Sequence, residues 1–195
     1  MPAINHIWLI RHGETPWSLS GQHTGKTEME LTPVGQAMAK AVGHALGGHK
    51  FAMVLTSPRI RARETCRLSG YGGSAIIEEN LQEWDYGGYE GRKSVEIKAE
   101  IPGWSLWRDG VRDGESLASV GSRADQVIRR AMDCEGDVAM FAHGHILRVL
   151  GARWLGLPPD GGKYFALDAG TISILGFEHQ RPVITQWNMI PPRSL

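Results

Sequence analysis

Apolar residues along this chain alternate between short continuous runs and longer stretches with a helical repeat. Short runs are typical of strands buried on both faces, whereas an apolar residue every three or four positions indicates a helix with one buried face. The predicted strands cover residues 4–10, 51–57, 74–79 and 137–145. The predicted helices cover residues 33–46, 57–68, 115–132 and 146–157. This alternation predicts an α/β fold, a three-layer α/β/α sandwich with a mostly parallel sheet.

Local signals refine several of these boundaries. Thr32-Pro33 is typical of a helix start, and Ser57-Pro58 repeats the signal before the second helix. Residues 81–114 contain glycine, proline and tryptophan without a clear period, so we expect loops and short helices there. In the tail, residues 163–178 and 181–190 favour a strand hairpin with Asp168-Ala-Gly as its turn.

Composition narrows the class of protein. The 195 residues suffice for one domain, expected to span residues 1–195. Lys plus Arg and Asp plus Glu both number 21, a balance that argues against a nucleic-acid or membrane partner. The two cysteines are too few for a disulfide framework and lack the spacing of a metal site. Without a signal peptide or a long apolar run, a cytoplasmic location is expected.

Three of the predicted strands end in polar clusters. Arg11-His12 follows the first strand, residues 57–63 follow the second, and His143-Gly-His145 ends the fourth. Because the carboxyl ends of adjacent parallel strands meet at one edge of a sheet, we expect these side chains to converge. Arginines in such a pocket favour an oxyanion such as phosphate. One neutral imidazole can then attack phosphorus while the other donates hydrogen bonds to the phosphoryl oxygens.

Four ordered motifs carry a family resemblance. "LIRHGET", "TSPRIRARET", "LQEWDYGGYEG" and "MFAHGH" resemble the signatures of the histidine phosphatase superfamily, the phosphoglycerate-mutase-like group, and span residues 7 to about 170. The resemblance implies a phosphoglycerate-mutase-like fold and a reaction without a metal or other cofactor. Within the superfamily, "WSLSGQHTGKTEMELTP", "WRDG" and "LDAG" are most similar to the sedoheptulose-1,7-bisphosphatases.

The resemblance also implies roles for individual residues. His12 would be the nucleophile that becomes phosphohistidine, and Glu83 would protonate the leaving oxygen and later activate water. Arg11, Arg61 and His143 would complete the phosphate pocket. Arg61 is the family's second arginine because it directly precedes Ala and lies four residues before Thr. The substrate site would include His23, Thr24, Trp84, Asp85, Tyr86 and Arg148.

These expectations favour a metal-independent hydrolase of small sugar phosphates, resembling sedoheptulose-1,7-bisphosphatase. A broad-specificity acid phosphatase and a phosphoglycerate mutase remain open, although the segment after the acid motif is short for a mutase. A regulatory phosphate-binding module and a metallohydrolase also stay open, although no HExxH-type ligand pair supports a metal site. Arg108 is a candidate for a second phosphate, and His145 is expected to be structural. The predicted partner is a small phosphorylated sugar, and the oligomeric state, a homodimer included, stays open.

Overall fold

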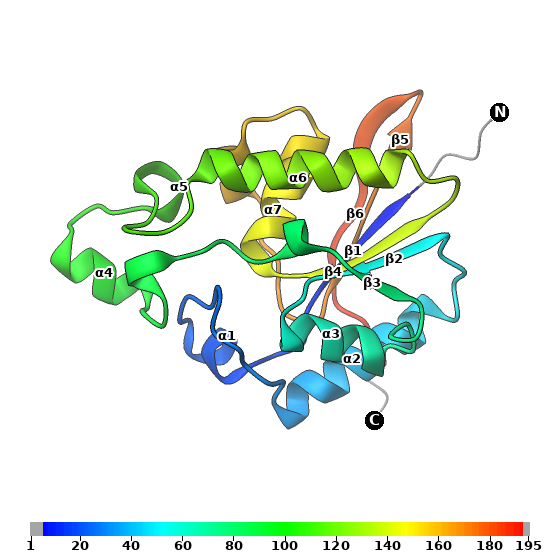
Figure 1. Ribbon diagram of the computed structural model, residues 1–195, viewed down its shortest axis with the longest axis horizontal. Helices are drawn as coiled ribbons and strands as arrows, with labels where there is room; N and C mark the ends of the chain where they lie inside the picture. Colours follow the sequence, from blue (N-terminus) through cyan, green and yellow to red (C-terminus); the bar gives the residue numbers. More distant parts are fainter. Residues whose placement is uncertain (1–5, 193–195) are drawn as a thin grey trace.

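The strands of the chain form one six-stranded sheet (Figure 1). The computed structural model describes residues 6–192, so the first two residues of the strand predicted at 4–10 lie outside the described part. The strands are β1 (Ile7–Arg11), β2 (Met53–Thr56), β3 (Ala75–Ile77), β4 (Val138–Ala142), β5 (Ile172–Glu178) and β6 (Arg181–Met189). Their order is β3-β2-β4-β1-β5-β6. The first four strands are parallel to one another, whereas β5 pairs antiparallel with both β1 and β6, which confirms the mostly parallel sheet.

Helices cover both faces of this sheet (Figure 1). α2 (Pro33–Leu46) and α3 (Ile60–Leu68) pack on one face, and α6 (Leu117–Met132) and α7 (Gly144–Trp154) pack on the other. Strand β4 is buried along its whole length, with Met140 in one apolar cluster and Phe141 in the opposite one. The predicted three-layer sandwich is therefore confirmed. Among residues 6–192, no helix has the length and apolar character needed to cross a membrane.

Short elements gather beyond the carboxyl ends of the parallel strands. α1 (Pro16–Ser20) follows β1 directly, and the predicted irregular segment contains α4 (Ser94–Glu100) and α5 (Leu106–Asp109). The 3₁₀ helices are η1 (Glu79–Leu81), η2 (Gly87–Tyr89) and η3 (Pro159–Tyr164). In Figure 1, α1, α4 and α5 project from the sheet on the side where β1 ends. These elements can therefore form walls around any site at the strand ends.

Two helix boundaries differ from those predicted. α3 begins at Ile60 instead of Ser57, with Arg59 at the N-cap position. The Ser57 hydroxyl is not a helix cap because it lies 2.7 Å from His143 Nε2 and interacts with that ring. Strand β4 stops at Ala142, so the predicted strand end at His145 is wrong: His145 lies in the first turn of α7.

The tail hairpin exists, but its turn is not at Asp168. Chain reversal between β5 and β6 occurs at His179 and Gln180, whose φ angles of 46° and 67° suit a two-residue hairpin turn. Gly170, with φ of 65°, forms a separate turn before β5. Its backbone N–H donates to the His12 carbonyl at 2.9 Å, so this turn supports the candidate site instead of joining two strands.

Two glycines let the start of α2 touch the loop after β1. A Cβ atom added to Gly35 would lie 2.1 Å from the Glu14 carbonyl oxygen, and one added to Gly13 would lie 2.3 Å from the Gly35 carbonyl oxygen. Thr32 reinforces the contact, because its N–H donates to the Glu14 carbonyl at 3.0 Å and its hydroxyl to the Glu14 carboxylate at 2.7 Å. The α2 start therefore fixes the loop that follows His12.

Replacing Gly35 with alanine should destabilise the protein although alanine favours helices. The new methyl group meets backbone atoms that cannot rotate away, so we expect a loss of about 1–3 kcal/mol in the free energy of unfolding. Urea denaturation measures the change. Gly73→Ala is the matched control because a Cβ there meets nothing within 4 Å. Equal stability of the two variants would show that the contact imposes no constraint.

Candidate active site

A cavity of about 100 Å³ lies where β1 and β4 end. Its walls combine Arg11 and His12 from the end of β1, Glu83 from the segment after η1, and Gly144 and His145 from the start of α7. Parallel pairing sets Arg11 beside Ala142, directly before His143. The topology therefore brings together three motifs that are far apart in the sequence.

His12 is a buried, neutral imidazole. Its Nδ1 lies 2.7 Å from the carbonyl oxygen of Gly13, which can only accept, so Nδ1 carries the proton and Nε2 carries the lone pair. Burial, reinforced by the charges of Arg61 and Arg11, holds the pKa of His12 well below its ordinary value. Within residues 6–192 no hydrogen bond engages His12 Nε2. The arrangement leaves a nucleophilic nitrogen at the cavity.

His143 is also buried and neutral, but both of its ring nitrogens are engaged. Arg61 Nε donates to Nδ1 at 3.1 Å, so the proton must be on Nε2, which donates to Ser57 Oγ at 2.7 Å. Burial is the largest cause that lowers the pKa of His143, followed by the charge of Arg61. The His12 and His143 rings lie edge to face with centroids 5.2 Å apart. This ring is consequently held in one tautomer beside His12.

Arg61 joins the centre of the site to the loop after α1. Its side chain is fully buried. Besides the bond to His143, Nη1 donates to the Thr27 carbonyl at 3.0 Å, and Nη2 donates to the carbonyls of Thr24 and Gly25 at 3.0 and 2.9 Å. Four of its five N–H groups are thus used, and one on Nη1 remains.

Glu83 accepts hydrogen bonds from three backbone N–H groups. Oε1 accepts from Trp84 at 3.0 Å and from Ile146 at 2.9 Å, while Oε2 accepts from His145 at 3.0 Å. Two of these donors belong to the first turn of α7, where a negative charge is favoured by the helix dipole. The contact secures the carboxyl group at the start of the helix. Each carboxylate oxygen can accept two hydrogen bonds. Oε1 already accepts two and Oε2 only one, so the unused acceptor position lies on Oε2.

Arg11 supplies the second cation of the cavity. Its Nη1 donates to the carbonyl of Leu167, whereas its buried Nε has no acceptor among the described residues. The guanidinium packs beside Gly144 at the start of α7, where a Cβ would be in ordinary contact with it at 3.4 Å from Arg11 Cζ. The charged side chains that line the inner cavity are those of Arg11, Glu83 and Arg148, while Arg61 and His143 contact each other without lining it.

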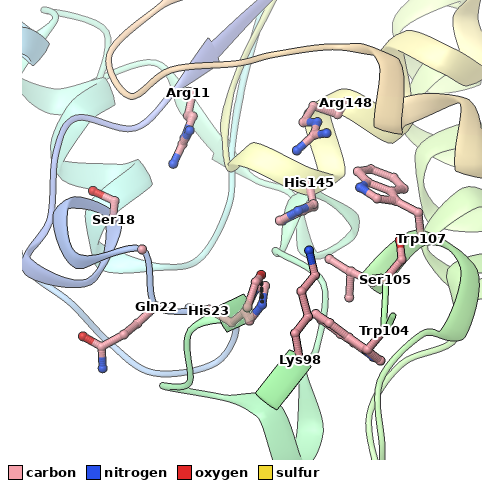
Figure 2. Close-up of a pocket in the computed structure, with 13 residues that line it drawn as sticks. Arg11, Ser18, Gln22, His23, Lys98, Trp104, Ser105, Trp107, His145 and Arg148 are labelled. Carbon is pink, nitrogen blue, oxygen red and sulfur yellow. Dashed lines mark hydrogen bonds between the residues drawn. The ribbon is translucent and has the colours of Figure 1, made fainter. Parts of the chain in front are cut away.

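A second, larger cavity of about 400 Å³ continues from the first. The two share Arg11, Ser18, Gln22, His145 and Arg148. Figure 2 shows the outer cavity, with Lys98 and Trp104 from the irregular segment opposite Arg11. The inner cavity has room for a phosphoryl group, and the outer one has room for the remainder of a small ligand.

Three of the six predicted substrate residues line these cavities. His23 lines the outer cavity, Thr24 the inner one, and Arg148 both. Burial lowers the pKa of His23, and its Nε2 lies 3.2 Å from the Ser94 hydroxyl. The positions of these three residues agree with the sequence-based expectation, although their contact with a substrate stays a prediction.

The other three, Trp84, Asp85 and Tyr86, do not line either cavity. The buried indole of Trp84 donates to the Glu115 carbonyl at 2.7 Å. Asp85 is 2.6 Å from Lys26 and faces a different surface pocket. Tyr86 is buried behind the wall, with its hydroxyl 2.6 Å from His145 Nδ1. Their sequence position beside Glu83 suggested substrate contact, but an extended segment directs neighbouring side chains to different sides.

His145 and Arg108 have different surroundings from each other. His145 lines both cavities; burial, followed by the charge of Arg148, holds its pKa well below the ordinary value. Tyr86 fixes the orientation of its ring, so it has a structural contact as well as a cavity face. The exposed Arg108 instead pairs with Asp109 at 2.8 Å and lines neither cavity.

Sequence reasoning missed several residues of the cavity walls. Ser18, Gln22, Ser94, Lys98, Ser105 and Trp107 all line the outer cavity. Gln22 and Trp107 lie inside motifs that carry the family resemblance, a signal that could have identified them. Lys98 has no local signal, since it is one exposed lysine on a short helix. In the described part of the chain, no cluster of three or more His, Cys, Asp or Glu could hold a metal ion.

Comparison with known proteins relates this site to an enzyme family. The sequence model of the histidine phosphatase superfamily (branch 1) matches residues 7–190. An acid phosphatase of Mycobacterium tuberculosis is 41% identical over 92% of this chain and 90% of its own length. The sedoheptulose 1,7-bisphosphatase of Saccharomyces cerevisiae is 36% identical over 80% and 70%, respectively. The solved structure of the Mycobacterium tuberculosis open reading frame Rv3214 superimposes with a TM-score of 0.92 at 38% identity, covering 96% of this chain and 99% of the other.

The protonation states of His12 and His143 can be measured by ¹⁵N NMR. Because burial and the two arginines disfavour the imidazolium form, we expect both rings to be neutral at about pH 6, with Nδ1–H in His12 and Nε2–H in His143. In the unfolded chain both histidines take up protons near about pH 6.5. The free energy of unfolding should therefore fall as the pH drops below that value. An imidazolium signal from either ring in the folded protein at about pH 6 would contradict the assignment.

Proposed function

This chain belongs to the histidine phosphatase superfamily, and we propose that it hydrolyses phosphate monoesters of small sugars through a phosphohistidine, without a metal ion. The observation that carries the proposal is the state of His12: neutral, with Nδ1 bound to the Gly13 carbonyl and Nε2 free at a cavity that also holds Arg11 and Glu83. A nucleophile, a positive field and a proton donor are the groups that phosphoryl transfer to and from a side chain requires.

In the first step, the lone pair of His12 Nε2 attacks phosphorus and the bond to the ester oxygen breaks. Glu83 gives its proton to that oxygen, so the sugar leaves as an alcohol instead of an alkoxide. Arg11, which lines the inner cavity, stabilises the charge on the transferred phosphoryl oxygens, and the buried charge of Arg61 adds to the positive field from its place at His143. The step leaves a phosphohistidine and an ionised Glu83.

In the second step, water attacks the phosphohistidine from the side that the sugar has left. Glu83 takes a proton from the water as the bond from phosphorus to Nε2 breaks. Inorganic phosphate and neutral His12 are regenerated. The unused acceptor position on Oε2 is where both proton transfers would take place, since the three N–H donors occupy the others.

His143 can donate to a phosphoryl oxygen only after a change of partner. Its Nδ1 accepts from the charged Arg61, so the proton available for donation is the one on Nε2, which Ser57 accepts in the unliganded cavity. Exchange of Ser57 Oγ for a phosphoryl oxygen would replace a neutral acceptor with a charged one. Charge-assisted hydrogen bonds are the stronger type, which favours this exchange when phosphate is present.

The substrate proposal follows the sedoheptulose 1,7-bisphosphatase relative, and a broad-specificity acid phosphatase is the second candidate. The motifs around His23 and Arg148 resemble those of the sedoheptulose-1,7-bisphosphatases, while the mycobacterial acid phosphatase has the higher identity to this chain. A ketose bisphosphate preferred over simple monoesters in kcat/KM would support the first candidate. Similar values across many unrelated monoesters would support the second.

Covalent catalysis can be tested by rapid quench with a ³²P-labelled substrate after EDTA treatment. We expect a phosphoenzyme that is stable in base and labile in acid, because phosphorus is bound to an imidazole nitrogen. His12→Ala should abolish the label, and the exposed His44→Ala should retain it as a control. Labelling of the His12→Ala variant would disprove the nucleophile assignment. Labelling that is lost with EDTA and restored by Zn²⁺ or Mg²⁺ would favour a metallohydrolase.

The acid role of Glu83 can be isolated by changing the leaving group. Glu83→Gln cannot transfer a proton, so release of a sugar alcohol should slow by roughly 10²–10⁴-fold. Release of p-nitrophenolate should change much less, because this anion leaves without protonation. The single-turnover burst is the measurement, since the second step also needs Glu83.

Two controls separate chemistry from folding in that experiment. The NH₂ group of the glutamine would face a backbone N–H that donates to Glu83 in the wild-type protein. Thermal melts must therefore show that the variant folds and that the first turn of α7 is not destabilised. Glu135→Gln makes the same chemical change at an exposed residue near the opposite ends of the strands. An equal loss for both leaving groups in a folded variant would mean that Glu83 positions the phosphoryl group instead of protonating the leaving oxygen.

A further inference from the structure

The outer cavity has an excess of positive charge that the transferred phosphoryl group does not explain. Arg11, Lys98 and Arg148 all line it, and none of its lining residues is an aspartate or a glutamate. His23 and His145, which also line it, have pKa values lowered by burial and add no positive charge at neutral pH. Arg11 and Arg148 also line the inner cavity, so Lys98 is the cation that lines the outer cavity alone, and Arg148 lies where the two cavities meet.

Arg148 is held in a fixed position by the cavity wall. Its guanidinium lies 4.7 Å from the centre of the Trp107 ring, and its Nε donates to the Gly162 carbonyl at 3.1 Å. Gly162 in turn packs on Trp107, since a Cβ there would lie 2.8 Å from the indole ring. Its Nη2 also donates to the Lys163 carbonyl at 3.5 Å, which leaves three N–H groups on Nη1 and Nη2 unused. Such a preorganised arginine suits a phosphate or a carboxylate.

Lys98 approaches the same cavity from the other wall. Its neighbour Ile97 is fully buried and anchors α4, while the Lys98 amino group points into the cavity toward the side of His145 and Arg148 (Figure 2). The acidic residues of α4 are engaged elsewhere: Glu96 accepts from the Lys93 backbone, and Glu100 pairs with Arg92. No ion pair occupies Lys98 within the described part of the chain.

We propose that Lys98 and Arg148 together bind a second phosphate group of the substrate while the first lies at His12. This inference rests on the proposed function and its first candidate, a small sugar carrying two phosphates, and adds Lys98 as the residue that recognises the second phosphate. The cavity of about 400 Å³ lies within the size range of small-molecule sites. Between its ends, Ser18, Gln22 and Ser105 offer hydrogen bonds to sugar hydroxyls. Lys98 is the residue that determines specificity, because Arg148 lies close enough to line the inner cavity too.

The test compares a ketose 1,7-bisphosphate with the matching 1-monophosphate. Lys98→Met removes the charge and keeps the length of the side chain. We expect kcat/KM for the bisphosphate to fall about tenfold, mainly through KM, because one charge-assisted contact is lost. Activity on the monophosphate and on p-nitrophenyl phosphate should stay within about twofold. Lys98→Arg should restore the preference, and Lys40→Met, an exposed lysine outside the cavity, should change nothing.

Binding separates this inference from the proposed reaction. In the His12→Ala background no turnover occurs, so calorimetry gives the Kd of both sugars with and without Lys98→Met. If the wild-type protein hydrolysed none of these esters, the proposed function would fail, while a Lys98-dependent preference for the bisphosphate in binding would still support the subsite. If Lys98→Met weakened the binding of both sugars equally, or of neither, the second-phosphate subsite would be overturned. A larger Lys98 dependence for 3-phosphoglycerate, which carries a carboxylate, would overturn the assignment to phosphate.

Discussion

The buried guanidinium of Arg61 is the constraint on which the arrangement of the site depends. It donates to His143 Nδ1 and to three backbone carbonyls between residues 24 and 27, so one side chain positions a ring and a loop. The donation also determines which nitrogen of His143 carries a proton. Its charge adds to the effect of burial in keeping His12 neutral. Removal of this cation would therefore change geometry and protonation together.

Glu83 connects the chemistry to the fold in a comparable way. Its carboxyl group accepts from the first turn of α7, the helix that begins directly after His143. One contact thus satisfies helix N–H groups that would otherwise need water or a cap, and it fixes the position of the Glu83 carboxyl group at the inner cavity. Gly35 at the start of α2 and Gly13 in the loop after β1 likewise fix the loop that follows His12, through backbone contact. Catalytic groups and helix ends are consequently supported by the same interactions.

The inner and outer cavities depend on different parts of the chain. The inner one is formed at the ends of buried parallel strands, where sheet pairing leaves little freedom. The outer one is walled by α4, α5 and the loop after α1, which pack beyond the sheet. Variation of this outer wall can change the substrate without disturbing His12. The two relatives are both phosphatases but have names that indicate different substrates, which is consistent with this division.

The sequence by itself determined the α/β alternation, the three layers and the set of residues at the strand ends, because hydrophobic period and strand-end polarity are local properties. It also identified Arg11, His12, Arg61, Glu83 and His143 as a group through motifs that keep their order. It did not determine which side chains of residues 84–86 face the cavities, and Trp84, Asp85 and Tyr86 line neither of them. Nor did it indicate Lys98, whose position at the cavity depends on how α4 docks. Only the tertiary structure decided the hydrogen-bond partners of the two histidines and the cavity wall, because these depend on contacts between segments distant in sequence.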